Sequence, residues 1–439
     1  MLNVVHVDAE SVLKIGVHDI KETLVLDALS SPSYYWENSS FSKSDTKKDT
    51  IEDDGMGIDI MPYSLVFYTM KDIKNTFFTT FRIEDSEAFE KYIQNYSKEK
   101  STSIITDIEG YKHLTLEKSK VVLAWNAERL AVAMALETSI EKVKTVFDDV
   151  LLQHKLISDK KHPLIAKLRS TSDHIAYTNG DGLVTLNFND GEAIVEGIMH
   201  TEKSNTYYPD TVYEAIPNAS LQLFYDANFE QKENKEAFIK SLEGISFFRK
   251  NNIGVTDFVD RTSGFFNIGI KGTTIQTDTI VSYEYDDNFE KVAVKTTQEK
   301  KAPKIMVHMG AENESLNDYL INQGAIQDNV LKAIPFYTFY AKETAMHTSF
   351  STTKENIPTQ KMLHPGFFNV QVDFKALKED LFVPKLNEIS EVLEKLKIRA
   401  KQIEDTNTIE VNGYLSGANK DINIMSQLFF GLQKKDSLP

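Results

Sequence analysis

Cysteine is absent from the 439 residues of this chain. Its absence excludes disulfide bonds, thiolate metal sites, iron–sulfur clusters and a cysteine nucleophile. Long apolar runs are absent as well, because the most apolar stretch, residues 121–136, is interrupted by Asn126, Glu128 and Arg129. A membrane-spanning helix needs about 18 or more consecutive apolar residues. The sequence therefore predicts no transmembrane segment.

Basic residues are fewer than acidic residues in this chain. The 49 Lys and Arg residues are outnumbered by 65 Asp and Glu residues, which gives an acidic chain with a net charge of −16. A surface of this sign repels phosphate backbones and anionic lipids, and the sequence shows no basic face, so we expect no nucleic-acid partner. The rest of the composition, with 41% hydrophobic and 10% aromatic residues, is typical of a folded globular protein.

Catalytic and cofactor motifs are absent too. No two of the ten histidines have the His-x-His or His-x-x-x-His spacing that brings two imidazoles to one metal, so we expect no metal site built on a histidine pair. Residues 264–269 carry both glycines of a phosphate loop, but Ile270 stands where the phosphate-binding lysine is needed. We therefore predict no catalytic residue and no cofactor. A histidine site assembled from distant residues is left open.

Two acidic stretches contain the hard oxygen ligands that Ca²⁺ prefers, grouped around glycines. The first comprises Glu52, Asp53, Asp54 and Asp59, and the second comprises Asn187, Asn189, Asp190 and Glu192. Neither has the spacing of an EF-hand, and a solvated loop and a β-turn are the alternatives. The sequence leaves the metal content of the chain unknown.

Internal similarity indicates that one structural module is used more than once. Within residues 85–93, positions 86–93 align on residues 313–320 when Glu87 is set on Glu314, and both segments carry apolar side chains at the i, i+3 and i+4 spacing of a helix face. Each segment follows a strand-like run and precedes a pair of apolar strands. We therefore expect residues 77–125 and 304–350 to superpose as the same strand–helix–strand–strand unit.

A short alternating strand that ends in aspartate occurs three times, at Asp8, Asp226 and Asp373. An aspartate carboxylate accepts hydrogen bonds from the free N–H groups where a helix or turn begins. We therefore interpret these residues as three separate structural caps rather than as a catalytic set. The alternative to a repeat is that strand–Asp–helix is simply a common junction.

The local patterns together predict an α+β protein with repeated β-α-β-β modules and mainly antiparallel sheets covered by helices. Turn sequences at 179–182 and 189–191 separate alternating runs and predict hairpins. The apolar stripe from Leu386 to Ile403 predicts one helix that lies on a sheet.

Shifts in composition predict the organisation of the chain. We expect an N-terminal α+β module at residues 1–160 with a flexible loop at 37–59, central β-hairpins at residues 161–215, and a C-terminal α+β repeat module at residues 216–439.

These repeats, with the closing segments Asn412–Leu415 and Asn419–Asn423, resemble a family of exported bacterial proteins and lipoproteins of Gram-negative cells that are classed as domains of unknown function. The resemblance implies a periplasmic or surface-anchored α+β protein with no assigned activity and no catalytic residues to carry over. The first residues show neither a lipobox cysteine nor a signal peptide, so we expect any leader or lipid anchor to lie outside this sequence. A cytoplasmic location is the alternative.

For the function, we expect a non-enzymatic envelope protein that binds a protein partner or an apolar ligand. Catalytic motifs are missing, and aromatic residues gather in runs such as residues 336–340, where both faces of a strand would be aromatic. The alternative is a hydrolase that uses Asp and Glu carboxylates gathered from distant parts of the chain.

Overall fold

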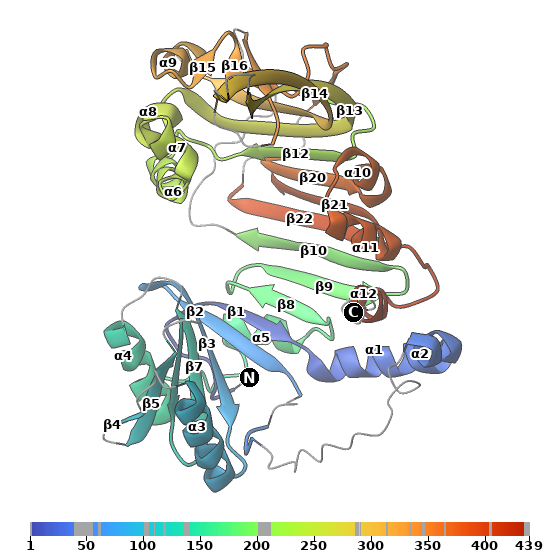
Figure 1. Ribbon diagram of the computed structural model, residues 1–439. Coiled ribbons are helices and arrows are strands. Elements are labelled where there is room, and N and C mark those ends of the chain that lie inside the picture. The colour runs from blue at the N-terminus through green and yellow to red at the C-terminus, as the bar shows by residue number, and fades with distance from the viewer. Residues whose placement is uncertain are drawn as a thin grey trace. The chain divides into compact units, whose positions relative to one another are not determined.

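The computed structural model divides into two compact units (Figure 1). Unit 1 comprises Met1–His200 and Asp421–Ser426, and unit 2 comprises Thr201–Lys420 and Gln427–Pro439. Each unit contains an antiparallel sheet with helices, which confirms the predicted α+β class. The structure describes residues 2–38, 56–59, 63–100, 105–108, 110–116, 120–135, 140–200, 212–285, 289, 291–312, 315–332, 336–344, 347–363, 366–403 and 406–433.

In the described residues, the sheet of unit 1 contains ten strands: β1 (Ala9–Ile15), β2 (Leu65–Met70), β3 (Ile73–Arg82), β4 (Ile105–Ile108), β5 (Tyr111–Leu116), β6 (Val121–Trp125), β7 (Arg129–Ala135), β8 (Ile175–Thr178), β9 (Leu183–Asn189) and β10 (Glu192–His200). Their order in the sheet is β10-β9-β8-β1-β2-β3-β7-β6-β5-β4, and every pair is antiparallel. The helices are α1 (Val17–Ser30), α2 (Pro32–Asn38), α3 (Ser86–Lys100), α4 (Ile140–Leu151) and α5 (Pro163–Arg169).

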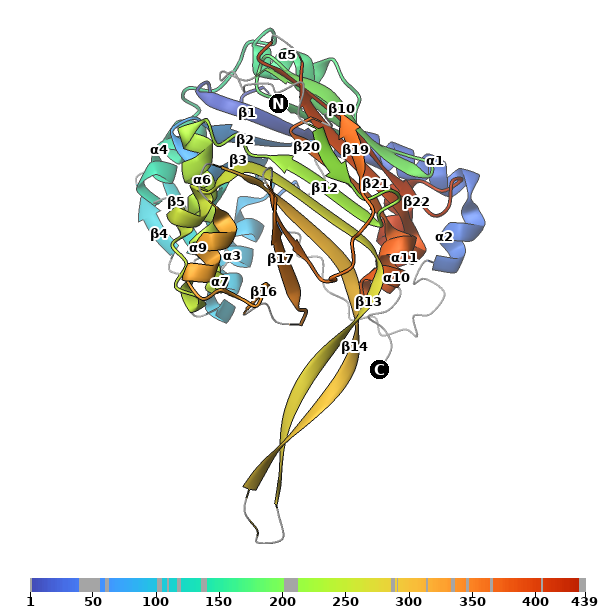
Figure 2. The same ribbon diagram turned by 90° about the horizontal axis from the view of Figure 1, so that it is seen from above.

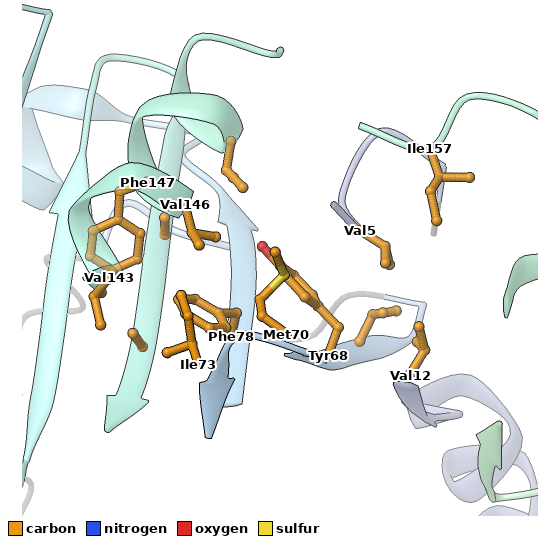
Figure 3. Close-up of a cluster of buried hydrophobic side chains, with 14 of the residues drawn as sticks. Val5, Val12, Tyr68, Met70, Ile73, Phe78, Val143, Val146, Phe147 and Ile157 are labelled. Carbon is orange, nitrogen blue, oxygen red and sulfur yellow. The ribbon is translucent and has the colours of Figure 1, made fainter. Parts of the chain in front are cut away.

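The main core of unit 1 forms where α4 covers the sheet (Figure 3). Alternate residues of β2 and β3 point to one face, so Tyr68 and Phe78 are buried and stack on each other with ring centroids 5.5 Å apart. On α4, the buried residues Val143, Val146, Phe147 and Val150 follow the helical spacing of three and four. The alternation along the strands and the helical spacing along α4 bring these side chains into one apolar cluster. This packing fixes which residues of the strands and of the helix face the core.

The main sheet of unit 2, as far as its residues are described, also contains ten strands: β12 (Leu221–Asp226), β13 (Thr262–Tyr285), β14 (Lys291–Ala311), β15 (Ile326–Gln327), β16 (Val330–Leu331), β17 (Phe339–Glu343), β18 (His347–Ser351), β20 (Phe368–Asp373), β21 (Leu393–Gln402) and β22 (Thr408–Gly417). Their order is β22-β21-β20-β12-β13-β14-β18-β17-β16-β15, again antiparallel throughout. A separate pair joins β11 (Val212–Ala215) to β19 (Gln360–Leu363). The helices are α6 (Lys232–Leu242), α7 (Ser246–Lys250), α8 (Val255–Val259), α9 (Leu316–Asn322), α10 (Phe374–Asp380), α11 (Pro384–Val392) and α12 (Ile424–Gln433), which starts within unit 1.

The two sheets have the same strand order when the strands are numbered within each unit. β1, β2 and β3 correspond in position to β12, β13 and β14, and α3 and α9 each follow the third strand of their sheet. Among the described residues, each helix is followed by four strands, β4–β7 in unit 1 and β15–β18 in unit 2, whereas the expected strand–helix–strand–strand module has two. The superposition of residues 77–125 on 304–350 stays a prediction.

One helix prediction is wrong. The segment from Leu386 to Ile403 was expected to be a single helix, but α11 ends at Val392 and the chain continues as β21, paired with β20 and β22. From Leu396 onward, the residues alternate between apolar and basic side chains, which also fits the period of two that a strand requires. Pairing on both edges of β21 selects that second period.

The segment at 161–215 does not form a separate block of hairpins. The hairpin β9–β10 turns at Asp190 and Gly191, as predicted, but β8 pairs with β1 and so joins the sheet of unit 1. Within the same segment, β11 belongs to unit 2 through its pairing with β19. Most of the expected flexible loop at 37–59 lies outside the described residues.

A two-stranded ribbon extends from unit 2 (Figure 2). β13 pairs with β12 only as far as Ile270, and β14 pairs with β18 only from Met306 onward. From the pair Thr273–Pro303 to the pair Tyr285–Lys291, the described residues of β13 and β14 pair only with each other. Within the described parts of the chain, no helix has the length and apolarity needed to cross a membrane.

Candidate metal centre

Two imidazoles and a carboxylate meet in unit 2. The side chains are those of Glu214 on β11, His308 on β14 and His347 on β18, and one ligand atom from each lies within 4.8 Å of the others. Imidazole nitrogen and carboxylate oxygen are both ligands for divalent transition metals. These three residues, called the Glu-His-His cluster below, are the strongest candidate for a metal site in the described residues.

Strand register brings the two histidines together. In the antiparallel pair β14–β18, His308 lies opposite Ser349 and Gly310 lies opposite His347. Residues two apart on a strand share a face, so the two imidazoles are diagonal neighbours on one side of the sheet. Their rings stack, with centroids 4.2 Å apart and planes 19° apart.

Glu214 reaches the cluster from the separate β11–β19 pair. Its backbone carbonyl accepts a hydrogen bond from the Asn267 side-chain amide, which anchors β11. The hydroxyl of Thr359, beside β19, donates to Glu214 Oε2 at 3.1 Å. A second oxygen of the same carboxylate is therefore available to face the histidines.

The cluster lies on the wall of a pocket with a volume of about 800 Å³. Other residues on the wall are mostly polar, and they include Asn329, Tyr340, Lys342, Ser349, Ser351 and Thr353. This volume falls within the usual range for small-molecule sites. The pocket could therefore admit a further ligand beside an ion held by the cluster.

Both histidines are held in the neutral form. Burial and, to a smaller extent, the neighbouring His347 lower the pKa of His308 to about 4, against the opposing effect of the Glu214 carboxylate. The pKa of His347 is also lowered by burial, against the effect of Glu214 and with a contribution from Lys342. Neutral imidazole is the form that binds metal, so ions can bind near pH 7 with little proton release.

A metal would require the histidine rings to turn. Zinc–nitrogen bonds of ~2.0–2.1 Å place tetrahedral ligands about 3.3 Å apart, which is closer than the 4.8 Å limit of the present cluster. The in-plane lone pairs of stacked rings also lie in nearly parallel planes, so they do not converge on one point. A rotation of at least one imidazole about its side-chain bonds would make them converge.

The candidates proposed from the sequence have different outcomes. Glu52, Asp53 and Asp54 of the first acidic stretch lie outside the described residues. In the second stretch, Asn187 is engaged inside unit 1, where its amide donates to Asp173 and its oxygen accepts from the backbone N–H of His174. No ion-binding arrangement of the second stretch is evident among the described residues.

The three aspartates do not share one role. Asp373 caps α10 as predicted, because its Oδ1 accepts from the backbone N–H of Ala376 at 3.0 Å. Asp226 accepts from the backbone N–H of Asn228 at 2.9 Å and so shapes a turn. The antiparallel pairing of β12 with β20 sets these two at opposite ends of the strand pair. Asp8 precedes β1 instead of ending a strand, so its predicted capping role is wrong.

Spacing along the chain does not reveal the Glu-His-His cluster. The prediction that no metal site uses a histidine pair rested on short-range spacing and stays a prediction until metal binding is measured. The sequence predicts strands at both His308 and His347, and this is the signal that it offers for the cluster. Their proximity depends on which strands pair and in which register, and a single sequence does not show either.

Comparisons with known proteins add little. No protein-family model matches the chain, and no curated protein matches it. A solved structure, crystal form I of the protein TP0453, aligns with 46% of this chain and 78% of that chain, at 11% sequence identity and a TM-score of 0.27. A likeness this low supports no conclusion about family or function.

Proposed function

We propose that this chain is a binding protein whose unit 2 pocket holds a divalent transition-metal ion through Glu214, His308 and His347. The observation that supports this most is the convergence of two neutral imidazoles and a carboxylate on the wall of one pocket. Nitrogen ligands favour ions such as Zn²⁺ over Ca²⁺ and Mg²⁺, which prefer oxygen. The polar wall makes an apolar ligand a poorer fit.

Metal-assisted hydrolysis is the second candidate function. Three protein ligands leave one tetrahedral position for water, which is the arrangement of catalytic zinc sites, and the pocket provides space for a substrate. The cluster itself contains one carboxylate, so it gives no support to a hydrolase that works with two facing carboxylates. Turnover of a chromogenic ester or phosphoester by the zinc-loaded protein would favour the enzyme over the binding protein.

Zinc titration tests the proposed site. We expect chelator-washed protein to bind one Zn²⁺ per chain in isothermal titration calorimetry, and His347→Ala to weaken binding by about 100-fold or more. The reason is that even changes to residues around metal ligands cost about 10–100-fold in affinity, and His347 would be a ligand itself.

His154→Ala is the matched control, because His154 is exposed and lies in unit 1. This variant should bind zinc as the unaltered chain does. The proposal fails if the unaltered chain binds no zinc, or if His347→Ala and His308→Ala both keep its affinity.

The ribbon of β13 and β14 supports the protein-partner part of the expected function. Two-stranded ribbons are marginally stable alone in water, and their open edges present N–H and C=O groups that can pair with an added strand. Phe289, between the end of β13 and the start of β14, is 86% exposed. We therefore include in the proposal an extended segment of another protein that pairs with this ribbon. An envelope location also belongs to the proposal, and it rests on the family resemblance.

Photo-crosslinking in cells tests the ribbon. A photoreactive residue at position 289 should form an adduct with one defined protein, whereas the same residue at exposed Tyr92 on α3 should not. Replacing residues 278–298 with Asn-Gly closes the ribbon at the facing pair Thr277 and Glu299. When it is produced in the same cell as the full-length photoreactive chain, the shortened protein should fail to compete for the adduct. After purification, the shortened protein should unfold at the same temperature as the full-length chain. If the shortened protein and the full-length chain without the photoreactive residue compete equally well, the ribbon does not bind the partner.

A further inference from the structure

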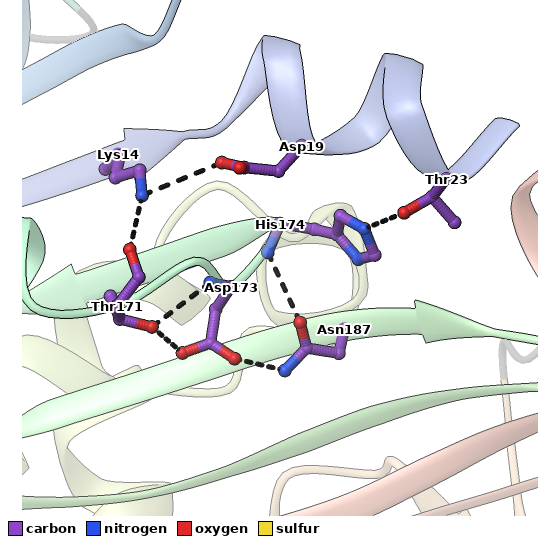
Figure 4. A network of polar contacts seen from close by, with 7 residues as sticks. All are labelled: Lys14, Asp19, Thr23, Thr171, Asp173, His174 and Asn187. Atoms are coloured by element: carbon purple, nitrogen blue, oxygen red, sulfur yellow. Dashed lines mark hydrogen bonds and ion pairs between the residues drawn. The ribbon is translucent and has the colours of Figure 1, made fainter. Parts of the chain in front are cut away.

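Unit 1 contains a second polar pocket, which is unrelated to the metal centre. Lys14 on β1 and Asp19 in the first turn of α1 lie on its wall, and the pocket has a volume of about 520 Å³. The Lys14 side chain is only 5% exposed, and its Nζ lies 3.8 Å from Asp19 Oδ2 (Figure 4). A buried charge pair on the wall of a pocket is unusual, because burial costs energy unless the charges are fully hydrogen-bonded.

This charge pair has unused hydrogen-bonding capacity. The Lys14 ammonium carries three N–H groups, and within the described residues it donates one hydrogen bond, to the carbonyl of Thr171 at 2.9 Å. Asp19 Oδ2 is buried and has no hydrogen-bond partner among the described residues. Gly16 makes room for this oxygen, because a Cβ atom at that position would stand 2.3 Å from it.

The neighbouring polar groups are satisfied (Figure 4). His174 Nδ1 accepts from the backbone N–H of Phe188 at 2.9 Å, so its proton is on Nε2 and is donated to Thr23 Oγ1 at 2.7 Å. Asp173 accepts hydrogen bonds from the Thr171 hydroxyl and the Asn187 amide. Among the buried polar groups on the pocket wall, the unused capacity therefore belongs to Lys14 and Asp19, and the exposed Arg169 lies on the same wall.

An aromatic ring completes the wall. Tyr63 lines the pocket, is 68% exposed, and stacks on His18 with ring centroids 4.7 Å apart and planes 20° apart. The backbone N–H of His18 also donates to the carbonyl of Tyr63 at 3.1 Å, which fixes the tyrosine at the pocket. Hydroxyl groups of Ser64 and Ser172 lie on the same wall.

We infer that this pocket binds a neutral polyhydroxylated ligand, a sugar, with one hydroxyl bridging Lys14 Nζ and Asp19 Oδ2. A hydroxyl both donates and accepts, so it can accept from the ammonium and donate to the carboxylate at once. Two atoms 3.8 Å apart can both lie about 2.8 Å from one oxygen. A free anion would meet the bare Asp19 oxygen, and a free cation would meet Lys14. The ring of Tyr63 provides an apolar face for the C–H groups of the sugar.

Saturation-transfer NMR with glucose, galactose, mannose and N-acetylglucosamine tests this inference on the full chain, with sodium phosphate and sodium acetate as anionic probes. At least one sugar should receive saturation from the unaltered protein. The signal should fall about tenfold in Asp19→Asn, which converts the accepting oxygen to an amide, and in Tyr63→Ala. Tyr63 is mostly exposed, so the second variant should fold normally. Tyr92→Ala, a change of similar type on α3, should bind as the unaltered chain does.

The results separate this site from the metal centre. His347→Ala should keep full sugar binding, whatever its zinc affinity, because the two pockets share no residue. The inference is overturned if no sugar in the panel binds, if only phosphate or acetate binds, or if Asp19→Asn and Tyr63→Ala both bind sugar as well as the unaltered chain.

Discussion

Replacing Asp27 with alanine is expected to lower the free energy of unfolding of unit 1 by about 3–5 kcal/mol. Asp27 lies on α1 and is 5% exposed. Its Oδ2 accepts from the hydroxyls of Tyr35 at 2.7 Å and Ser426 at 2.8 Å, and its Oδ1 accepts from the backbone N–H of Asn423 at 3.1 Å. Each hydrogen bond to a charged group contributes about 1.5–3 kcal/mol. Alanine would leave the buried backbone N–H of Asn423 without this acceptor, and the hydroxyls of Tyr35 and Ser426, which also hydrogen-bond to each other, would lose their bonds to the carboxylate.

Urea unfolding followed by circular dichroism measures this loss. Asp8→Ala is the control, because the Asp8 side chain is 70% exposed and its replacement should change stability by about 0.5 kcal/mol or less. Hydrogen exchange gives a second readout: residues 421–426, which Asp27 ties into unit 1, should lose protection in Asp27→Ala. A loss of stability no greater than that of Asp8→Ala would show that the carboxylate does not hold this segment.

Local patterns predicted those parts of the fold that depend on neighbours in sequence. The hairpin at Asp190 and Gly191 and the cap at Asp373 each depend on fewer than ten residues, and both are present. The segment after Val392 was misread because its apolar residues fit both a helical and a strand period. Only pairing with β20 and β22 decides between the two periods, and that pairing is a tertiary interaction.

The candidate sites depend on contacts that no local pattern contains. The metal centre needs three strands from different parts of the chain, and the Asp27 network joins α1 to a segment near the C-terminus. In the unit 1 pocket, Lys14 and Asp19 are close in sequence, but nothing in their spacing marks them as a site. Their importance comes from burial and from the missing hydrogen-bond partners, which only the three-dimensional structure provides.

Acid is expected to destabilise unit 2 through His308. The pKa of His308 is about 4 in the folded protein, against an ordinary value of 6.5. Between these two values the unfolded chain binds a proton that the folded chain does not, so stability decreases as pH falls. The contribution of His308 is fully present above about pH 6.5 and is lost on approach to pH 4. The difference of about 2.5 pKa units corresponds to roughly 3 kcal/mol. His347, whose pKa is also lowered by burial, acts in the same direction.

The measurement compares the unaltered chain with His308→Gln in urea at pH 7 and at pH 4, with a chelator present so that no metal contributes. Glutamine has no titrating group, so the stability difference between the two proteins should shift by about 3 kcal/mol between these pH values, in favour of the variant at low pH. His154→Gln, which alters an exposed histidine in unit 1, should leave the difference nearly constant. If the difference for His308→Gln is the same at both pH values, His308 is not held neutral in the folded protein. The neutral imidazole pair on which the proposed metal site depends would then be absent as well.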